Sequence, residues 1–324
     1  MRRAAGPIAD ASTRRTRPAP CRQACRPERL PPPRSWRTGT GRRYLVGMAN
    51  ALTQVRDVEI GPGRPLAILA GPCVAESRDV CLRAGEAMKR ACDRLGMSYV
   101  FKASFDKANR SSIHSARGPG LDAGLELIAA VGRELGVPTT TDVHEASQAE
   151  ACGQAVDLLQ VPAFLCRQTD LLVACAATGK PVNVKKGQFL SPAEMTQVVA
   201  KLDESQAAGI VLTERGTFFG YQRLVNDFVG LVDLMGLGRP VCFDVTHSTQ
   251  QPGGLGLSTG GRPDAAPTLA RCAVATGVHA LFLETHPDPA SGLSDAATML
   301  PFATATAVLE DAARLRAALD AATA

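Results

Sequence analysis

The chain lacks any run of about 18 consecutive apolar residues, so no helix is expected to cross a membrane. Its ten cysteines form no C-x-x-C pair, and most lie in apolar or helical segments, where a free thiol behaves as a small hydrophobic group. This usage fits a reducing cytoplasm and argues against a disulfide framework. A Walker loop, a deaminase motif and a protease-like nucleophile signature are also missing, which excludes those enzyme classes.

The first 47 residues contain no lysine and almost no acid. They hold twelve arginines against Asp10 and Glu28, a net charge of +10, while the whole chain carries +5, so the remainder carries −5. The acidic body argues against a nucleic-acid-binding surface, despite the basic total. The segment is also rich in proline and poor in large aliphatic residues, so it cannot bury enough surface to fold alone.

Residues 1–47 are therefore interpreted as a disordered or non-native extension, and residues 48–324 as a single catalytic domain. Three origins fit the extension: a disordered tail, an arginine-rich transit-type presequence, or upstream DNA translated from a wrong start codon. We favour the last, because Met48 stands just ahead of the first patterned segment. The segment has no apolar central region, so it is not a secretory signal.

From residue 55 onward, short apolar runs alternate with longer segments that have helical spacing. Eight runs rich in Val, Ile, Leu and Phe are predicted as buried strands, at residues 66–70, 98–102, 137–141, 157–161, 181–184, 209–212, 240–244 and 280–284. Helices are predicted at residues 79–95, 121–135, 192–205, 221–235, 263–276 and 304–321. Ser191, Pro192 and Glu194 form a plausible start for one of them.

Eight strand–helix units in about 270 residues predict an α/β fold, the (β/α)8 TIM barrel. A doubly wound sheet is the alternative, but it usually has a glycine-rich fingerprint after its first strand, and none is present. Residues 55–60, followed by a Gly-Pro-Gly turn, predict a short extra strand or hairpin before the barrel. This element is expected to plug the bottom of the barrel.

Polar motifs follow the carboxyl end of each predicted strand. The densest is residues 101–112, FKASFDKANRSS, where three cations, an amide and several hydroxyls follow a buried run. In a barrel all eight strand ends converge on one face, and that face holds the active site. Cations bind phosphate, while amides and hydroxyls orient oxygen-rich molecules, so the substrates are expected to be phosphorylated.

Two groups of residues at these strand ends carry chemistry. The first is cationic and comprises Lys102, Lys107, Arg110, Lys185, Lys186 and Arg215. Like charges gathered in one place need an anionic partner, which two phosphorylated substrates would supply. The second offers metal ligands of S, N, O and O type, namely Cys73, His247, Glu284 and Asp295. That mixture suits a divalent transition metal such as Zn, Fe, Mn or Co, although Cys73 is also plausible as an inert packed thiol.

Six motifs between residues 66 and 301 make the chain resemble the family of 3-deoxy-D-manno-octulosonate 8-phosphate synthase (KDO 8-phosphate synthase). They are FKASFDKANRSS (101–112), TDVHE (141–145), QVPAFLCRQTDL (160–171), NVKKGQFLSP (183–192), FDVTH (243–247) and ETHPDP (284–289). The resemblance implies a homotetrameric (β/α)8 barrel in the cytoplasm. It also implies condensation of phosphoenolpyruvate with D-arabinose 5-phosphate, a step in lipopolysaccharide precursor synthesis.

The resemblance also implies roles for individual residues. Phosphoenolpyruvate would be held by Lys107, Lys185, Arg215 and Gln160. The sugar phosphate would be held by Asn109, Arg110 and Ser111, with Arg110 extending toward a neighbouring subunit's site, while Lys102 and Asp142 line its hydroxyl side. Ser104 is a further expected substrate-binding residue. Lys107, Lys185, His247 and Asp295 are the expected catalytic residues.

The family has metal-dependent and metal-free branches, and the metal-free branch carries Asn where this chain has Cys73. Cys73, Gly187 and the sequence Leu293-Ser294-Asp295 therefore resemble the metal-dependent branch. The related 3-deoxy-D-arabino-heptulosonate 7-phosphate synthase, which uses erythrose 4-phosphate, is the main alternative. Its Lys-Pro-Arg-Thr-Ser motif lacks the extra Asn of this chain, which favours the longer arabinose phosphate. A non-catalytic sugar-phosphate sensor is a remote alternative, because sensors tend to lose a reacting residue.

Overall fold

Eight parallel strands close into a ring in the computed structural model, which describes residues 52–109, 113–252 and 260–323. The ring strands are β3 (Ala67–Gly71), β4 (Ser98–Lys102), β5 (Thr139–Asp142), β6 (Leu158–Val161), β7 (Val182–Lys185), β8 (Ile210–Glu214), β9 (Val241–Asp244) and β12 (Ala280–His286). Closure occurs at β12, which pairs with β9 on one side and with β3 on the other. All eight predicted strands are present, and the predicted (β/α)8 barrel is confirmed.

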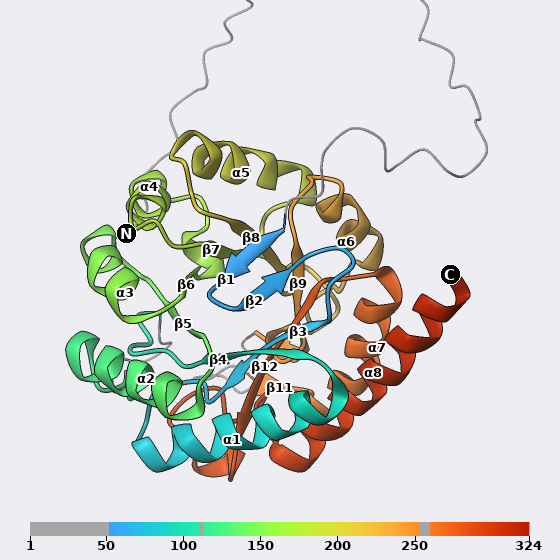
Figure 1. The fold of residues 1–324 in the computed structure, drawn as a ribbon, viewed down its shortest axis with the longest axis horizontal. Helices are drawn as coiled ribbons and strands as arrows, with labels where there is room; N and C mark the ends of the chain where they lie inside the picture. Colours follow the sequence, from blue (N-terminus) through green and yellow to red (C-terminus); the bar gives the residue numbers. More distant parts are fainter. Residues whose placement is uncertain (1–51, 110–112, 253–259, 324) are drawn as a thin grey trace, which may run out of the picture. The chain divides into compact units, whose positions relative to one another are not determined.

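Helices surround the ring in chain order (Figure 1). They are α1 (Arg78–Leu95), α2 (Leu121–Leu135), α3 (Ala149–Ala155), α4 (Thr169–Ala177), α5 (Met195–Glu204), α6 (Phe228–Met235), α7 (Ala266–Thr276) and α8 (Phe302–Thr323). Ser191 and Glu194 form the expected capping box ahead of α5. No helix in the described part of the chain is long and apolar enough to span a membrane.

The helix predicted at residues 221–235 is wrong in its first half. Helix α6 begins only at Phe228, because Asp227 has an extended backbone and its side chain accepts a hydrogen bond from the Gly230 amide. Upstream, Gln222 has a positive φ of 52°, and Thr217 pairs with Val225 in an antiparallel bridge. The loop after β8 is therefore longer than the apolar spacing indicated.

Two apolar cores hold the barrel together. The larger lies between the strands and the helices, and the smaller fills the barrel interior. Such division follows from strand geometry, because successive side chains point to opposite faces. On β3, for example, Ile68 packs outward and Leu69 packs inward.

A hairpin formed by β1 (Thr53–Val55) and β2 (Val58–Ile60) closes one end of the barrel. Its Val55 and Ile60 side chains are fully buried and belong to the interior core. The Thr53 hydroxyl donates to the Ile210 carbonyl at the start of β8, so the hairpin lies at the amino ends of the strands. Figure 1 shows both strands over the centre of the ring, and the predicted plug is confirmed. The hairpin therefore leaves the other end of the barrel, at the carboxyl ends of the strands, open for the candidate active site.

Candidate active site

A cavity of about 600 Å³ opens at the carboxyl ends of the strands. It is lined by nine of the predicted site residues: Lys102, Lys107, Asn109, Asp142, Lys185, Arg215, His247, Glu284 and Asp295. They come from six different strands or the loops that follow them. The closed ring therefore brings strand ends that are far apart in the sequence together in one polar site.

Two lysines share one buried carboxylate. Lys102 Nζ lies 2.6 Å from Glu284 Oε1, and Lys107 Nζ lies 3.8 Å from the same oxygen. Burial opposes ionisation of Glu284, yet Lys102 and then His247 lower its pKa from 4.5 to about 2. Burial likewise opposes the charge on Lys107, but its pKa is raised well above the ordinary value by Cys73, Glu284 and Asp142. Lys107 is thus held as a cation at the cavity wall.

A chain of hydrogen bonds runs from the loop after β4 through the neighbouring strands β5, β6 and β7 to β8. Lys107 Nζ donates to Ser104 Oγ at 3.0 Å, and Ser104 Oγ in turn donates to Asp142 Oδ2. Gln160 Nε2 donates to Asp142 Oδ1 at 2.6 Å, and Asn183 Nδ2 donates to Gln160 Oε1 at 3.0 Å. The chain of hydrogen bonds ends where the Thr213 hydroxyl donates to Asn183 Oδ1 at 2.6 Å. We name this chain from Ser104 to Thr213 the polar belt.

Every side chain in the polar belt is buried. Because buried polar groups are costly when unpaired, a fully connected chain fixes each rotamer against its neighbours. The polar belt therefore holds Asp142 and, through Ser104, the Lys107 ammonium. Gln160 contributes its amide to the polar belt and is absent from the described lining of the cavity, as are Ser104 and Cys73.

Asp244 connects a lysine and a histidine. Its Oδ2 lies 2.5 Å from Lys185 Nζ and 2.7 Å from His247 Nδ1. Burial opposes its ionisation, but His247 and Lys185 hold the pKa of this carboxyl far below its ordinary value. Burial likewise opposes protonation of His247, while Asp244 raises its pKa. Lys185 Nζ also lies 3.6 Å from the centre of the Phe282 ring, which fixes it over the barrel interior.

Arg215 is an almost fully buried guanidinium on the cavity wall. Its Nη2 donates to Gln250 Oε1 at 2.5 Å, and its Nη1 is buried with no hydrogen-bond partner among the described residues. Burial lowers the pKa of Arg215, although Asp244 opposes that effect. A buried guanidinium with a free N–H group is suited to binding an anion in the cavity.

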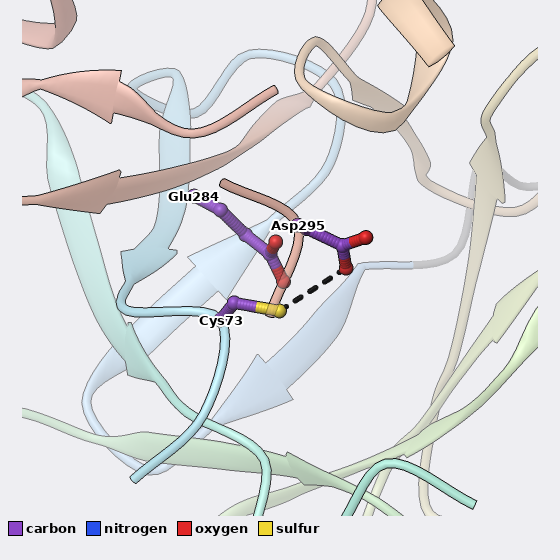
Figure 2. A group of neighbouring side chains, drawn as sticks. All are labelled: Cys73, Glu284 and Asp295. Atoms are coloured by element: carbon purple, nitrogen blue, oxygen red, sulfur yellow. Dashed lines mark hydrogen bonds between the residues drawn. The ribbon is translucent and has the colours of Figure 1, made fainter. Parts of the chain in front are cut away.

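Cys73, Glu284 and Asp295 point toward one another (Figure 2). One potential ligand atom from each lies within 4.8 Å of the other two, and the Cys73 thiol donates to Asp295 Oδ2 at 3.2 Å. His247 lies outside this mutual group, but its Nε2 is 3.6 Å from Glu284 Oε2 and 3.8 Å from Asp295 Oδ2. The structure thus contains a possible metal-binding group of three residues, with the fourth predicted ligand beside it.

The chemistry of this group fits a cation. Glu284 Oε2 is buried and has no hydrogen-bond partner among the described residues, which leaves a lone pair facing His247. Burial, followed by the charge of Glu284, raises the pKa of Cys73 well above its ordinary value. The Asp244–His247 contact also resembles the carboxylate–histidine pair that orients a metal-binding imidazole.

Some predicted residues lie outside the part of the chain that the structure describes, and some residues of the site were not predicted from the sequence. Arg110, Ser111 and the extension of residues 1–47 fall outside the described residues. Asn183, Thr213 and Asp244 were not predicted, although the five-residue FDVTH motif placed Asp244 three positions before His247. Asn183 begins the quoted NVKKGQFLSP motif, but no sequence signal marked Thr213 or the hydrogen-bond partners of either residue, because those partners come from neighbouring strands. The substrate-binding roles assigned to individual residues stay predictions.

The fold and the site together define a barrel enzyme whose mouth is built for anionic, oxygen-rich substrates. Its sequence places it more narrowly: the chain belongs to the DAHP synthetase I family, which matches residues 45–318.

Three relatives are similar along most of their length, and all are named 2-dehydro-3-deoxyphosphooctonate aldolase. The protein from Cyanothece sp. is 52% identical over 263 residues, covering 81% of this chain and 96% of the relative. The protein from Synechococcus sp. is 52% identical over 260 residues, covering 80% and 92%. The protein from Brucella ovis is 50% identical over 262 residues, covering 81% and 95%.

Proposed function

We propose that this protein is a transferase that condenses phosphoenolpyruvate with D-arabinose 5-phosphate and water. The products are 3-deoxy-D-manno-octulosonate 8-phosphate, a precursor of lipopolysaccharide, and phosphate. The observation that carries the proposal is the match of about half of all positions to relatives named for this product, over about four fifths of the chain. The cationic mouth of the barrel supplies the chemistry that two phosphorylated substrates need.

In this proposal the described polar and charged residues divide between the two substrates. Lys107, Lys185 and Arg215 bind the phosphate and carboxylate of phosphoenolpyruvate, while Lys102, Asn109 and Asp142 face the sugar. The enol carbon C3 attacks the aldehyde carbon, water adds at C2, and the resulting tetrahedral centre expels phosphate. The negative charge that moves onto the phosphate is stabilised by cations already fixed by Glu284, the polar belt and Asp244.

The same proposal includes a divalent transition metal of the Zn, Fe, Mn or Co type. Cys73, His247, Glu284 and Asp295 would hold it, which gives the buried lone pair of Glu284 a partner. When bound, such an ion polarises a carbonyl oxygen or lowers the pKa of a water molecule.

One assay tests substrate and metal together. Phosphate release from phosphoenolpyruvate is measured with arabinose 5-phosphate, before and after chelator treatment and after a transition metal is added back. We expect turnover that the chelator abolishes and the metal restores. Full activity in chelator would contradict the metal, and absence of turnover under every condition would contradict the function.

Cys73→Ala removes the sulfur ligand and should abolish metal-dependent turnover together with stoichiometric metal content. Cys272→Ala is the matched control, because Cys272 is a half-buried free thiol on α7, outside the cavity lining. Metal content is read by elemental analysis of the folded proteins. Equal metal content in the Cys73 variant and the control would overturn the ligand assignment.

Substrate choice is tested by comparing arabinose 5-phosphate with erythrose 4-phosphate under identical conditions. We expect the higher kcat/KM for arabinose 5-phosphate, and a preference for erythrose 4-phosphate would favour 3-deoxy-D-arabino-heptulosonate 7-phosphate synthesis instead.

The proposal also includes a homotetramer in the cytoplasm. The eight free cysteines among the described residues support a reducing compartment.

A further inference from the structure

Lys186 is a buried lysine that does not line the described part of the cavity. It follows Lys185 directly after β7, so the two side chains leave the barrel wall on opposite sides. Lys185 reaches the cavity, whereas Lys186 is 1% exposed and turns between the loops that follow β7 and β8. A buried ammonium needs several oxygen partners to offset its lost hydration.

Those partners come from two separate loops. Lys186 Nζ donates to the Leu190 carbonyl at 2.8 Å and lies 3.4 Å from the Gly187 carbonyl, both in the loop after β7. On the β8 side it lies 3.3 Å from Glu214 Oε2 and 3.4 Å from Thr217 Oγ1. The ammonium thus ties the two loops together at one point.

Glu214, the ion-pair partner of Lys186, also shapes the backbone that carries Arg215. Its Oε1 accepts hydrogen bonds from the Arg215 amide at 2.9 Å and the Gly216 amide at 2.6 Å. Glu214 is 3% exposed, so both of its oxygens act inside the protein. One carboxylate therefore links the Lys186 ammonium to the start of the β8 loop.

One further contact extends this arrangement to the cavity. The Phe218 amide of the β8 loop donates to the Gln188 carbonyl of the β7 loop at 2.9 Å. Gln188, Arg215 and Phe218 all line the cavity. Lys186 and Glu214 therefore lie behind the wall that presents the Arg215 guanidinium.

From this geometry we infer that Lys186 and Glu214 are positioning residues that fix Arg215 and Gln188 for binding the anionic enolpyruvate substrate. The inference rests on the proposed function, because it assigns the pair to that substrate's side of the cavity. The pair acts through the backbone of the two loops and touches no substrate. Its loss should therefore weaken phosphoenolpyruvate binding more than arabinose 5-phosphate binding.

The test uses the full-length, metal-loaded protein and two variants. Lys186→Met keeps the length of the side chain and removes its charge, while Glu214→Gln keeps an oxygen for the two amides and removes the charge facing Lys186. We expect Lys186→Met to raise the KM and the calorimetric Kd for phosphoenolpyruvate about tenfold, with the KM for arabinose 5-phosphate changed less than about twofold. Glu214→Gln should act in the same direction with a smaller effect.

Lys201→Met is the matched control, because the Lys201 ammonium also bonds a carbonyl and a hydroxyl, those of Arg167 and Thr169, but at the exposed surface. It should leave all constants unchanged. Folded variants that bind phosphoenolpyruvate like the wild type, or variants that both fail to fold, would assign the pair to stability alone and overturn the inference. A wild type that binds no phosphoenolpyruvate overturns the proposed function itself, and this inference with it.

Discussion

Asp244 connects two parts of the site, because its carboxylate contacts both the Lys185 ammonium and the His247 imidazole. One of its oxygens faces both Lys185 and His247, and the other accepts from the His247 amide at 2.9 Å. A fully buried carboxylate with several charged partners is difficult to replace, because each partner then loses its counter-charge inside the protein.

Asp244→Asn should therefore lower kcat/KM at least about tenfold and weaken metal binding about 10- to 100-fold, the range typical of residues that orient a metal ligand. Kinetics and metal content are measured on protein whose folding is verified by circular dichroism. Asp264→Asn is the control, since Asp264 pairs with Arg262 at the exposed surface. Unchanged kinetics and metal content in the Asp244 variant would contradict the role.

At the residue scale, the sequence predicts side chains that follow strand ends, and it fails for those that act through neighbouring strands. Lys102 was predicted because it ends an apolar run, whereas Asp142 was predicted from the family resemblance, in the TDVHE motif. Thr213 and Asn183 are bonded across 30 positions of the chain, and nothing local to either residue indicates that partner. Only the ring register brings them together.

At the element scale, the amino end of β12 contains a titratable group away from the site. His279 Nδ1 accepts a hydrogen bond from the Val241 amide at 2.9 Å. Burial, with a smaller contribution from Arg316, lowers the pKa of His279 from 6.5 to about 4. The folded protein therefore keeps this imidazole neutral where the unfolded chain protonates it.

The sign of the resulting pH effect follows from proton binding. Between pH 6.5 and 4 the unfolded chain binds more protons at this residue, so its contribution to stability is complete above pH 6.5 and is lost as pH falls toward 4. We expect a loss of about 2 kcal/mol between pH 7 and pH 5 from this group. Urea unfolding of the wild type and His279→Gln at both pH values measures it. An equal pH dependence in the two proteins would contradict the assignment.

The hairpin β1–β2 gives a second prediction for an element. Ile60 is fully buried in the interior core, so Ile60→Ala should lower the free energy of unfolding by about 2–5 kcal/mol. Val229→Ala, at a side chain that is 73% exposed on α6, should change it by less than about 0.5 kcal/mol. Denaturant unfolding compares the two. Similar losses in both variants would contradict the plug.

Elements were more predictable than their boundaries. The strands were found because buried parallel strands are continuous apolar runs, and helix α2 was predicted with the observed bounds. Helix α6 was predicted too long because the apolar spacing continues through residues 221–227. The Asp227 cap and the positive φ of Gln222 decide the boundary, and neither is visible in a hydrophobic pattern.

At the scale of the whole molecule, the family match begins at residue 45, close to the end of the arginine-rich segment. A chain that starts at Met48 should therefore keep kcat/KM within about twofold and unfold at the same temperature. The reason is compositional, because residues 1–47 are rich in arginine and proline and poor in large aliphatic residues. Kinetics and calorimetry of the truncated and full chains measure this. A large loss of activity or stability would show that the segment contributes to the enzyme.

The hairpin under the barrel has a consequence for traffic through the enzyme. Among the described residues, Val55, Val58 and Ile60 close the amino end of the barrel, so the proposed substrates and products share the opening at its carboxyl end. A molecule held at that opening blocks arrivals and departures alike. Turnover then requires that the product dissociate through this opening before the next sugar phosphate binds.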